Sequence, residues 1–134
     1  MPGLEPESPV GEAGATLDLP TATGLPPRLA ACLAYAAWWV SGGIVLAAEP
    51  SHPFVRFHAR QALVGFGIIW LAGVTLWATS FLAAFVSPWL FRAAAALANL
   101  VWGLGLVAWV ACLVAAARGR AWSLPLVDGR RPGA

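Results

Sequence analysis

The chain has 134 residues, of which 60% are hydrophobic and only 10% are charged. An ordinary soluble domain is about 45–50% apolar and about 25% charged, so this chain has too few charges to cover a water-facing surface. The composition therefore excludes a typical soluble enzyme and predicts a membrane protein. The net charge of +2 is too small to predict a nucleic-acid partner.

The N-terminal residues 1–27 have the composition of a disordered tail. They hold six of the eleven prolines, together with four glycines and four acidic residues. A segment of this kind buries too little apolar surface to offset the entropy lost on ordering. We expect a Pro- and Gly-rich acidic tail at 1–27, a membrane domain at 28–127 and a flexible tail at 128–134.

Three uncharged apolar runs predict membrane-spanning helices at about residues 29–48, 62–86 and 93–117. The first would be about 30 Å long as a helix, which is the thickness of the hydrocarbon core of a bilayer. The other two, at about 37 Å, would cross with some tilt. Unpaired backbone groups are too costly in lipid for any non-helical span of this kind. The predicted fold class is an all-α integral membrane protein, a bundle of three transmembrane helices.

The arginines predict the orientation of these spans. With three spans, Arg28 and Arg92 lie on one side of the membrane, and the six other arginines lie on the opposite side. Cytoplasmic loops carry an excess of basic residues. We therefore expect the first loop and the C-terminus in the cytoplasm, the N-terminus outside, and the protein in the lipid bilayer of a bacterial inner (plasma) membrane.

The first loop, residues 49–61, predicts a short cytoplasmic helical extension that continues into the second span. Ser51 can cap a helix that has Pro53 in its first turn. Helical spacing then places Phe54, Phe57, His58 and Gln61 on one face, with Arg56 and Arg60 on the adjacent face.

Two functions remain open for this extension. One is an interfacial anchor, with phenylalanine rings in the headgroup layer and arginines on lipid phosphate. The other is an interaction surface for a protein partner or ligand. Metal binding by His52 and His58 is disfavoured, because a six-residue spacing does not align ligands on a helix. The candidate interaction surface consists of Phe54, Arg56, Phe57, His58, Gln61, Arg118 and Arg120.

The spans contain few polar groups. Asn99 is the strongest of them, and the sequence places it at the depth of Ser80, which follows Thr79. A hydrogen bond between the second and third spans is the simplest use of these side chains, and a solute pathway is the alternative. The tryptophans within the spans are expected to pack opposite glycines, with an aromatic ligand cleft as the alternative. Cys32 and Cys112 are predicted to be too far apart for a disulfide.

The extension and the C-terminal segment together resemble a known family. Phe54-Val-Arg-Phe-His-Ala-Arg-Gln61 resembles the "F-x-R-F-H-A-x-Q" signature of small bacterial membrane proteins related to the twenty-kilodalton subunit of the chloroplast inner-envelope translocon. The segment from Ala117 to Val127 resembles the closing segment of this Tic twenty-like family. The resemblance covers residues 28–127 and implies an integral membrane bundle. For the plastid relatives, which have four spans, it implies a role in protein import.

These patterns favour a non-enzymatic role. The chain shows no nucleophile–base pair, no metal-ligand cluster and no cofactor motif. We expect an accessory or scaffolding component of a membrane protein assembly, in the context of import or translocation, with a protein partner or a homo-oligomer. The alternative is a pore or a binder of small molecules or lipids, formed by an oligomer and lined by Asn99, Thr75, Thr79 and Ser80.

Overall fold

The computed structural model describes residues 15–124, and its regular elements in this range are all helical. This confirms the all-α prediction for that part of the chain. The outer parts of the two predicted tails, 1–14 and 125–134, lie outside the described residues. In chain order the elements are α2 (Pro27–Leu33), α3 (Trp38–Ala48), α4 (Pro53–Gln61), the π-helical turn η1 (Ala62–Phe66), α5 (Gly67–Ala84) and α6 (Pro88–Ala117).

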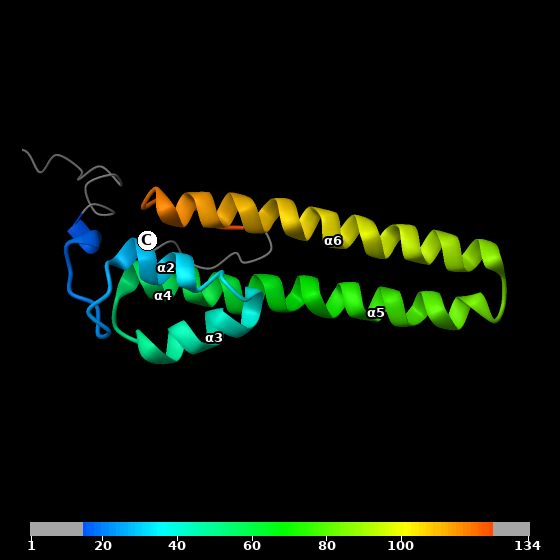
Figure 1. The fold of residues 1–134 in the computed structure, drawn as a ribbon, viewed down its shortest axis with the longest axis horizontal. Coiled ribbons are helices and arrows are strands. Elements are labelled where there is room, and N and C mark those ends of the chain that lie inside the picture. Colours follow the sequence, from blue (N-terminus) through cyan, green and yellow to red (C-terminus); the bar gives the residue numbers. More distant parts are fainter. Residues whose placement is uncertain (1–14, 125–134) are drawn as a thin grey trace, which may run out of the picture.

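A long antiparallel hairpin forms the frame of the molecule (Figure 1). Its first arm is continuous from Pro53 to Ala84 and combines α4, η1 and α5, and its second arm is α6, with 30 residues. Both arms are long and apolar enough to cross a membrane. The hairpin turns at Ser87-Pro88, where the Ser87 hydroxyl accepts a hydrogen bond from the Trp89 N–H and Pro88 occupies the first turn of α6. The predicted helical extension is therefore the first part of the longer arm.

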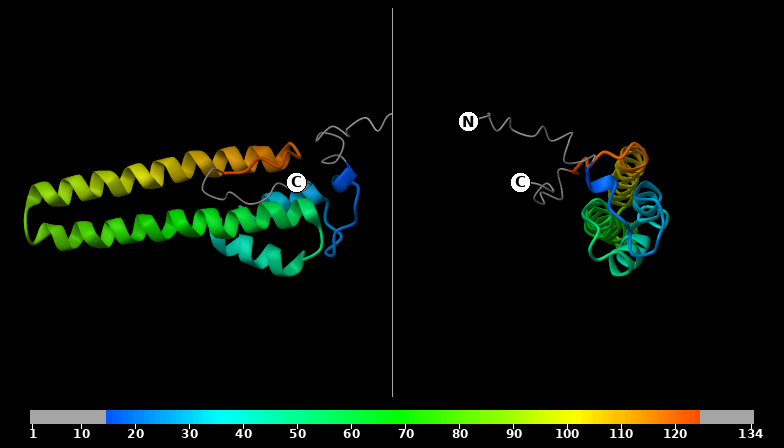
Figure 2. Two further views of the ribbon diagram at one scale, coloured as in Figure 1. Left: turned by 180° about the vertical axis from the view of Figure 1, so that it is seen from behind. Right: turned by 90° about the vertical axis from the view of Figure 1, so that its left-hand side faces the viewer.

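The first apolar run does not form one continuous helix. α2 ends at Leu33, the chain turns over residues 34–37, and α3 then runs back along α4 (Figures 1 and 2). With 11 residues, α3 is shorter than the roughly 20 needed to cross a bilayer. The structure thus has two helices of spanning length and one shorter apolar helix in place of three continuous spans among the described residues.

The break between α2 and α3 is stabilised by side chains that replace the lost helical hydrogen bonds. The Ser41 hydroxyl donates to the Ala34 carbonyl at 2.9 Å and accepts from the Ala37 N–H at 2.8 Å. The Trp109 indole N–H donates to the Tyr35 carbonyl at 2.7 Å. Trp38 follows the turn with a φ of 56°, which is rare for a residue with a side chain. Because neither Gly nor Pro occurs at 34–38, the break has no local sequence signal.

The returning helix α3 packs closely against the long arm at Gly42. A Cβ atom at this position would lie 2.7 Å from the Leu63 nitrogen and 2.9 Å from the Ala59 carbonyl oxygen. Glycine therefore allows α3 to touch the backbone of the long arm where α4 passes into η1. At the neighbouring Gly43, the nearest atom to an added Cβ is the Leu63 Cδ1 at 3.6 Å, an ordinary contact.

Tryptophan rings fill spaces beside small residues and beside one another. The ring of Trp102 occupies the position that a Cβ at Gly73 would need. Ring centroids lie 5.4 Å apart for Trp38 and Trp102, and 5.6 Å apart for Trp39 and Trp70. These contacts support the packing interpretation. They also show that Trp102 lies across from Gly73 of α5.

The two ends of the described chain lie at the same end of the hairpin, where α4 begins and α6 ends (Figure 1). The Leu19 carbonyl lies 3.2 Å from the His52 Nε2, and Leu17 and Arg28 lie beside Gly119. The sequence predicted that the N-terminal tail and the C-terminal segment lie on opposite sides of a bilayer, whereas residues 17–28 contact the start of α4 and the end of α6. The physical reason for this proximity is the break in the first apolar run, which returns the chain to the end of the hairpin from which it started.

Substitution of Gly42 tests the close approach of α3 to the long arm. Gly42→Ala should lower the free energy of unfolding by about 1–3 kcal/mol, because an added methyl group meets backbone that cannot move aside. The matched control, Gly43→Ala, should be neutral or stabilising by up to ~1 kcal/mol, since alanine is the better helix former. Thermal and denaturant unfolding in detergent measure the free energy of unfolding of the two variants. Equal stability of the two would contradict the packing described.

Candidate functional site

Helix α4 carries the motif that the sequence singled out. His52, rather than the expected Ser51, caps it, because the His52 Nδ1 accepts from the Val55 N–H at 3.4 Å and Pro53 opens the first turn. The helix then separates its side chains into two groups. Phe54, His58 and Gln61 are buried and Phe57 is half-buried, whereas Arg56 and Arg60 are exposed. The predicted interaction surface is therefore divided into a buried part and an exposed part.

His58 is fully buried and bonded through both ring nitrogens. Its Nε2 lies 3.1 Å from the Arg120 carbonyl, and its Nδ1 lies 2.9 Å from the Tyr35 hydroxyl. A carbonyl can only accept, so the Nε2 carries the proton and donates to Arg120. In the neutral imidazole the Nδ1 is then an acceptor, and the Tyr35 hydroxyl donates to it. The ring is held in one tautomer by partners from two other segments.

Gln61 extends this network one turn further along α4. Its Nε2 lies 3.3 Å from the Tyr35 hydroxyl, 3.3 Å from the Cys112 Sγ and 3.1 Å from the Trp122 carbonyl. Its Oε1 accepts from the Leu124 N–H at 3.2 Å. The amide has two hydrogens for three acceptors, so it uses its full donor capacity. Among the described residues, no buried side-chain nitrogen or oxygen lacks a hydrogen-bond partner.

These contacts join the two sequence segments that looked distinctive. His58 and Gln61 belong to the first segment, and the backbone groups of Arg120, Trp122 and Leu124 belong to the second. The C-terminal segment 120–124 is thus held against α4 as a strap over the buried polar network. We call this arrangement the polar clasp, defined by Tyr35, His58, Gln61 and the backbone of 120–124.

Sequence reasoning did not identify Tyr35 or Cys112 as members of the polar clasp. Tyr35 is the only tyrosine in the chain and lies in an apolar run. A buried tyrosine hydroxyl usually finds a hydrogen-bond partner, so this residue carried a usable signal. Cys112 looked like a small apolar residue, and both it and Cys32 are free in the structure. The described residues contain no group of three or more His, Cys, Asp or Glu side chains that could hold a metal.

A second set of hydrogen bonds holds the N-terminal segment to the same end. The buried Glu49 carboxylate accepts from the N–H groups of Ala22 and Thr23, each at 2.7 Å, and from the Thr23 hydroxyl. Burial raises the pKa of this carboxyl, but the hydrogen bonds from Thr23 and Ala22 and the nearby His52 outweigh it and leave the pKa lowered. Glu49 is therefore a carboxylate that caps a turn of the N-terminal segment.

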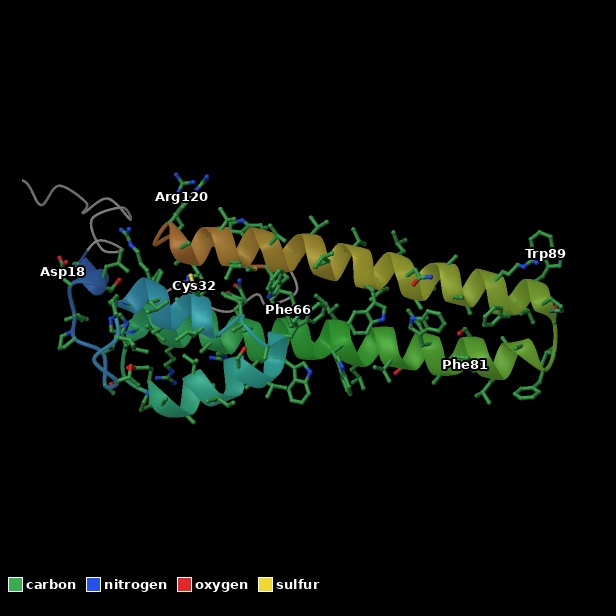
Figure 3. All side chains as sticks on the ribbon, viewed as in Figure 1. Asp18, Cys32, Phe66, Phe81, Trp89 and Arg120 are labelled. Carbon is green, nitrogen blue, oxygen red and sulfur yellow. The ribbon has the colours of Figure 1, made fainter. Side chains whose placement is uncertain are left out.

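Exposed arginines gather around the clasp. Arg28, at the start of α2, lies next to Gly119, where α6 has ended. Arg118 and Arg120 are exposed beside it, and Arg56 and Arg60 are exposed on α4. Figure 3 shows Arg120 pointing away from the bundle, while its carbonyl is held by His58. Arg92 is the one described arginine at the opposite end of the hairpin.

The predicted intramembrane polar contact involves Asn99, Ser80 and Thr79. Ser80 is buried and donates to the Trp77 carbonyl at 2.7 Å, and Thr79 donates to the Thr75 carbonyl at 2.8 Å. Asn99 is exposed on α6 and makes no hydrogen bond to another described residue. The hydroxyls are thus occupied within α5, and the structure does not bring Asn99 to them.

Comparison with known proteins identifies the fold's relatives. The magnetosome magnetite crystal formation protein family matches residues 26–130, which include the long hairpin and both segments of the clasp. The chain belongs to this family. A UPF0132 membrane protein of Methanocaldococcus jannaschii is 28% identical over 108 residues, covering 80% of this chain and 86% of the relative. No solved structure matches the chain.

Membership of the magnetosome family corrects the resemblance stated above. The Tic twenty-like family does not match, so that assignment is wrong, and the protein-import role that it implied is withdrawn with it. Membership and the two apolar arms agree with the prediction of a membrane protein. The F-x-R-F-H-A-x-Q segment is explained by the structure in another way, because its His and Gln hold the C-terminal strap.

Removal of the Gln61 amide tests whether the clasp holds the strap. Gln61→Leu leaves the Leu124 N–H and the Trp122 carbonyl without their partner, at about 1–3 kcal/mol for each buried unpaired group. The Leu124 amide should then exchange with deuterium at least about tenfold faster, since ~1.4 kcal/mol is a factor of ten. The control Arg60→Ala, which changes an exposed residue of the same helix, should leave this rate unchanged. Unchanged exchange in Gln61→Leu would contradict the role of the clasp.

Proposed function

We propose that this chain is a non-enzymatic accessory component of a membrane protein assembly, which presents its arginine-rich end to a protein partner. The observation that carries the proposal is that two kinds of polar side chain at that end, the buried ones and the exposed arginines, form separate groups. The buried polar side chains are bonded to one another and to backbone, while the arginines around them are exposed. The end is therefore a rigid support with a basic surface.

The bonding of the clasp favours a structural role over a chemical one. The two ring nitrogens of His58 and the amide of Gln61 are engaged with partners from the chain itself. A general base or nucleophile needs a reacting atom within hydrogen-bond reach. Here the positions around the buried groups are taken by the strap and by Tyr35, so these residues serve to hold the surface in shape.

The charges at this end favour an acidic partner. The basic side chains are Arg28, Arg56, Arg60, Arg118 and Arg120, all exposed. The Glu49 carboxylate is bonded to Ala22 and Thr23, and Asp18 is the other described acidic side chain at this end, so basic side chains outnumber acidic ones there. Arginine forms two-pronged hydrogen bonds with carboxylates. An acidic segment of a partner protein is the ligand that this surface fits, and anionic lipid is the competing ligand that the experiment separates from it.

The placement of the arginines also supports an orientation. Five described arginines lie at the clasp end, and Arg92 lies at the other. Basic residues are enriched on the cytoplasmic side of membrane proteins. We infer that the clasp end, with both the N-terminal segment from residue 15 and the C-terminal strap, faces the cytoplasm of a bacterial plasma membrane. In this inferred orientation the N-terminal segment faces the cytoplasm, whereas the arginine count of the sequence predicted that the N-terminus lies outside.

The relatives supply a context for the assembly. The family is described by the formation of magnetite crystals in magnetosomes, whereas the archaeal relative is described as a membrane protein. The feature that such different members can share is the membrane bundle itself. We therefore take from the family only its location in a membrane and assign no mineral-binding chemistry to the residues of this chain.

The orientation is tested by labelling from outside the cell. A cysteine that replaces Arg92 should react with a membrane-impermeant thiol reagent applied to intact cells. Cysteines that replace Arg60 or Ala22 should react only after the membrane is opened. The native cysteines provide the background, since Cys112 is buried and Cys32 is partly buried. Labelling of residue 22 and residue 92 from the same side would contradict the arrangement.

The partner surface is tested by purification in mild detergent. Two double variants are compared with the wild-type chain: Arg56→Ala with Arg60→Ala, and Arg118→Ala with Arg120→Ala. Each should reduce the amount of co-purified stoichiometric protein partner at least about tenfold, a change of ~1.4 kcal/mol in binding free energy. Arg92→Ala is the matched control and should retain it.

Protein and lipid are quantified in the same purified samples. If the double variants lose bound anionic lipid and no protein, the surface is a lipid anchor and the proposal is wrong. A wild-type chain that retains no protein partner would also overturn it.

A further inference from the structure

Helix α6 has a second apolar face that no described residue covers. The face consists of Ala96, Asn99, Gly103, Leu106 and Val110, all of which are exposed. Their spacing alternates between three and four residues, which is the a/d repeat of a coiled coil. We call this line of residues the α6 seam.

The seam is separate from the face by which α6 packs in the bundle. Ala98, Gly105 and Cys112 are buried on that other face, and Trp102 on the same side lies against Gly73 of α5. On the seam, a Cβ added at Gly103 would have no atom within 4 Å. Leu106 is 53% exposed and Val110 is 48% exposed. The seam is therefore open along about four helical turns.

Asn99 makes the seam different from an ordinary lipid-facing surface. Its amide is exposed and makes no hydrogen bond to a described residue. Asn99 lies about 16 Å from the start of α6 at Pro88, which is within the hydrocarbon layer if α6 crosses the membrane. Water is scarce at that depth, and an unpaired amide there is unfavourable. A partner that supplies both a donor and an acceptor would satisfy it.

We propose that a second copy of this chain docks on the α6 seam and forms a parallel two-fold dimer. An asparagine amide both donates and accepts, so two Asn99 side chains satisfy each other across a two-fold axis. Two copies inserted in one membrane share the same orientation, which makes the two α6 helices parallel. A single asparagine within an a/d seam fixes the register of paired helices.

Gly103 contributes close contact next to the Asn99 pair. Small residues allow membrane helices to approach and to gain packing contacts that larger side chains prevent. The seam continues to Arg92 near the hairpin turn, where two arginines can reach the headgroup layer and separate. The basic residue thus lies at the water-exposed end of the seam, and the self-complementary amide lies in its middle.

Cysteine cross-linking in the native membrane tests the position of the seam. Gly103→Cys and Leu106→Cys should form disulfide-linked dimers on mild oxidation. Leu104→Cys is the matched control, because Leu104 is 61% exposed on the same helix but lies off the seam. It should give no more dimer than the wild-type chain with Cys32 and Cys112 alone. Equal cross-linking at residues 104 and 106 would overturn the proposal.

The strength of the dimer tests the role of Asn99. Asn99→Leu should raise the dissociation constant in detergent or lipid by about three- to thirtyfold, the range for a hydrogen bond between membrane helices. Gly103→Ile should also weaken the dimer, by blocking close approach, whereas Leu104→Ile should not. Because these positions are exposed, each variant should retain the thermal unfolding midpoint of the monomer, and that measurement separates lost association from lost folding.

Subunit counting gives the decisive result. Single-molecule photobleaching of labelled chain in bilayers should show two steps for the wild-type protein and one for Asn99→Leu at the same density. A wild-type protein that bleaches in one step, or an Asn99→Leu protein that remains paired, overturns the proposal. The inference depends on α6 lying in the membrane and stands if the arginine-rich end proves to bind lipid alone.

Discussion

The structure depends on the hydrogen bonds of two buried side chains, His58 and Gln61. An imidazole and an amide are unfavourable inside an apolar bundle unless their polar atoms have partners. Here the partners come from the turn after α2, from α6 and from the strap at 120–124. The need to satisfy two side chains thus joins segments that lie some sixty residues apart in the chain. It also explains why the strap follows α4 and not the surface of α6.

The same requirement shapes the first apolar run. The turn at 34–37 interrupts a helix in apolar surroundings, and its freed groups are bonded by Ser41 and Trp109. The interruption places Tyr35 where its hydroxyl meets His58, so the break and the clasp support each other. Gly42 then allows α3 to return along the long arm at backbone contact distance. Together these contacts build a compact end on an otherwise two-helix hairpin (Figure 2).

At this compact end the Glu49 carboxylate is bonded internally, whereas the arginines and Asp18 are exposed. The opposite half of the hairpin has only α5 and α6, and its outer faces are apolar apart from Arg92 near the turn and from Asn99, Thr75 and Thr79. The Thr79 hydroxyl donates to the Thr75 carbonyl, so this hydrogen bond stays within α5. The molecule therefore has a polar end held together by hydrogen bonds and a largely apolar end that exposes the Asn99 amide on α6.

The sequence alone determined the properties that follow from composition and local periodicity. Long uncharged runs predicted apolar helices, and the spacing from Phe54 to Gln61 predicted a helix with one distinctive face. These features depend on side chains close together in the chain, so they could be derived without the fold. The direction of that face could not be derived. An amphipathic stretch next to a membrane span can face headgroups, solvent or protein, and only the position of the strap shows that His58 and Gln61 face inward.

The tertiary structure alone decided the number of long helices and the end of the hairpin at which the N-terminal segment lies. Residues 29–48 have the hydrophobicity of a span, and the sequence at 34–38 contains no helix breaker. The freed backbone groups of the break are bonded by Ser41 and, from far along the chain, by Trp109, whose indole donates to the Tyr35 carbonyl. Family membership came from comparison over residues 26–130 and replaced an assignment based on two short segments. Short-range pattern therefore determined which segments are apolar helices, and long-range hydrogen bonds decided how those helices are folded together.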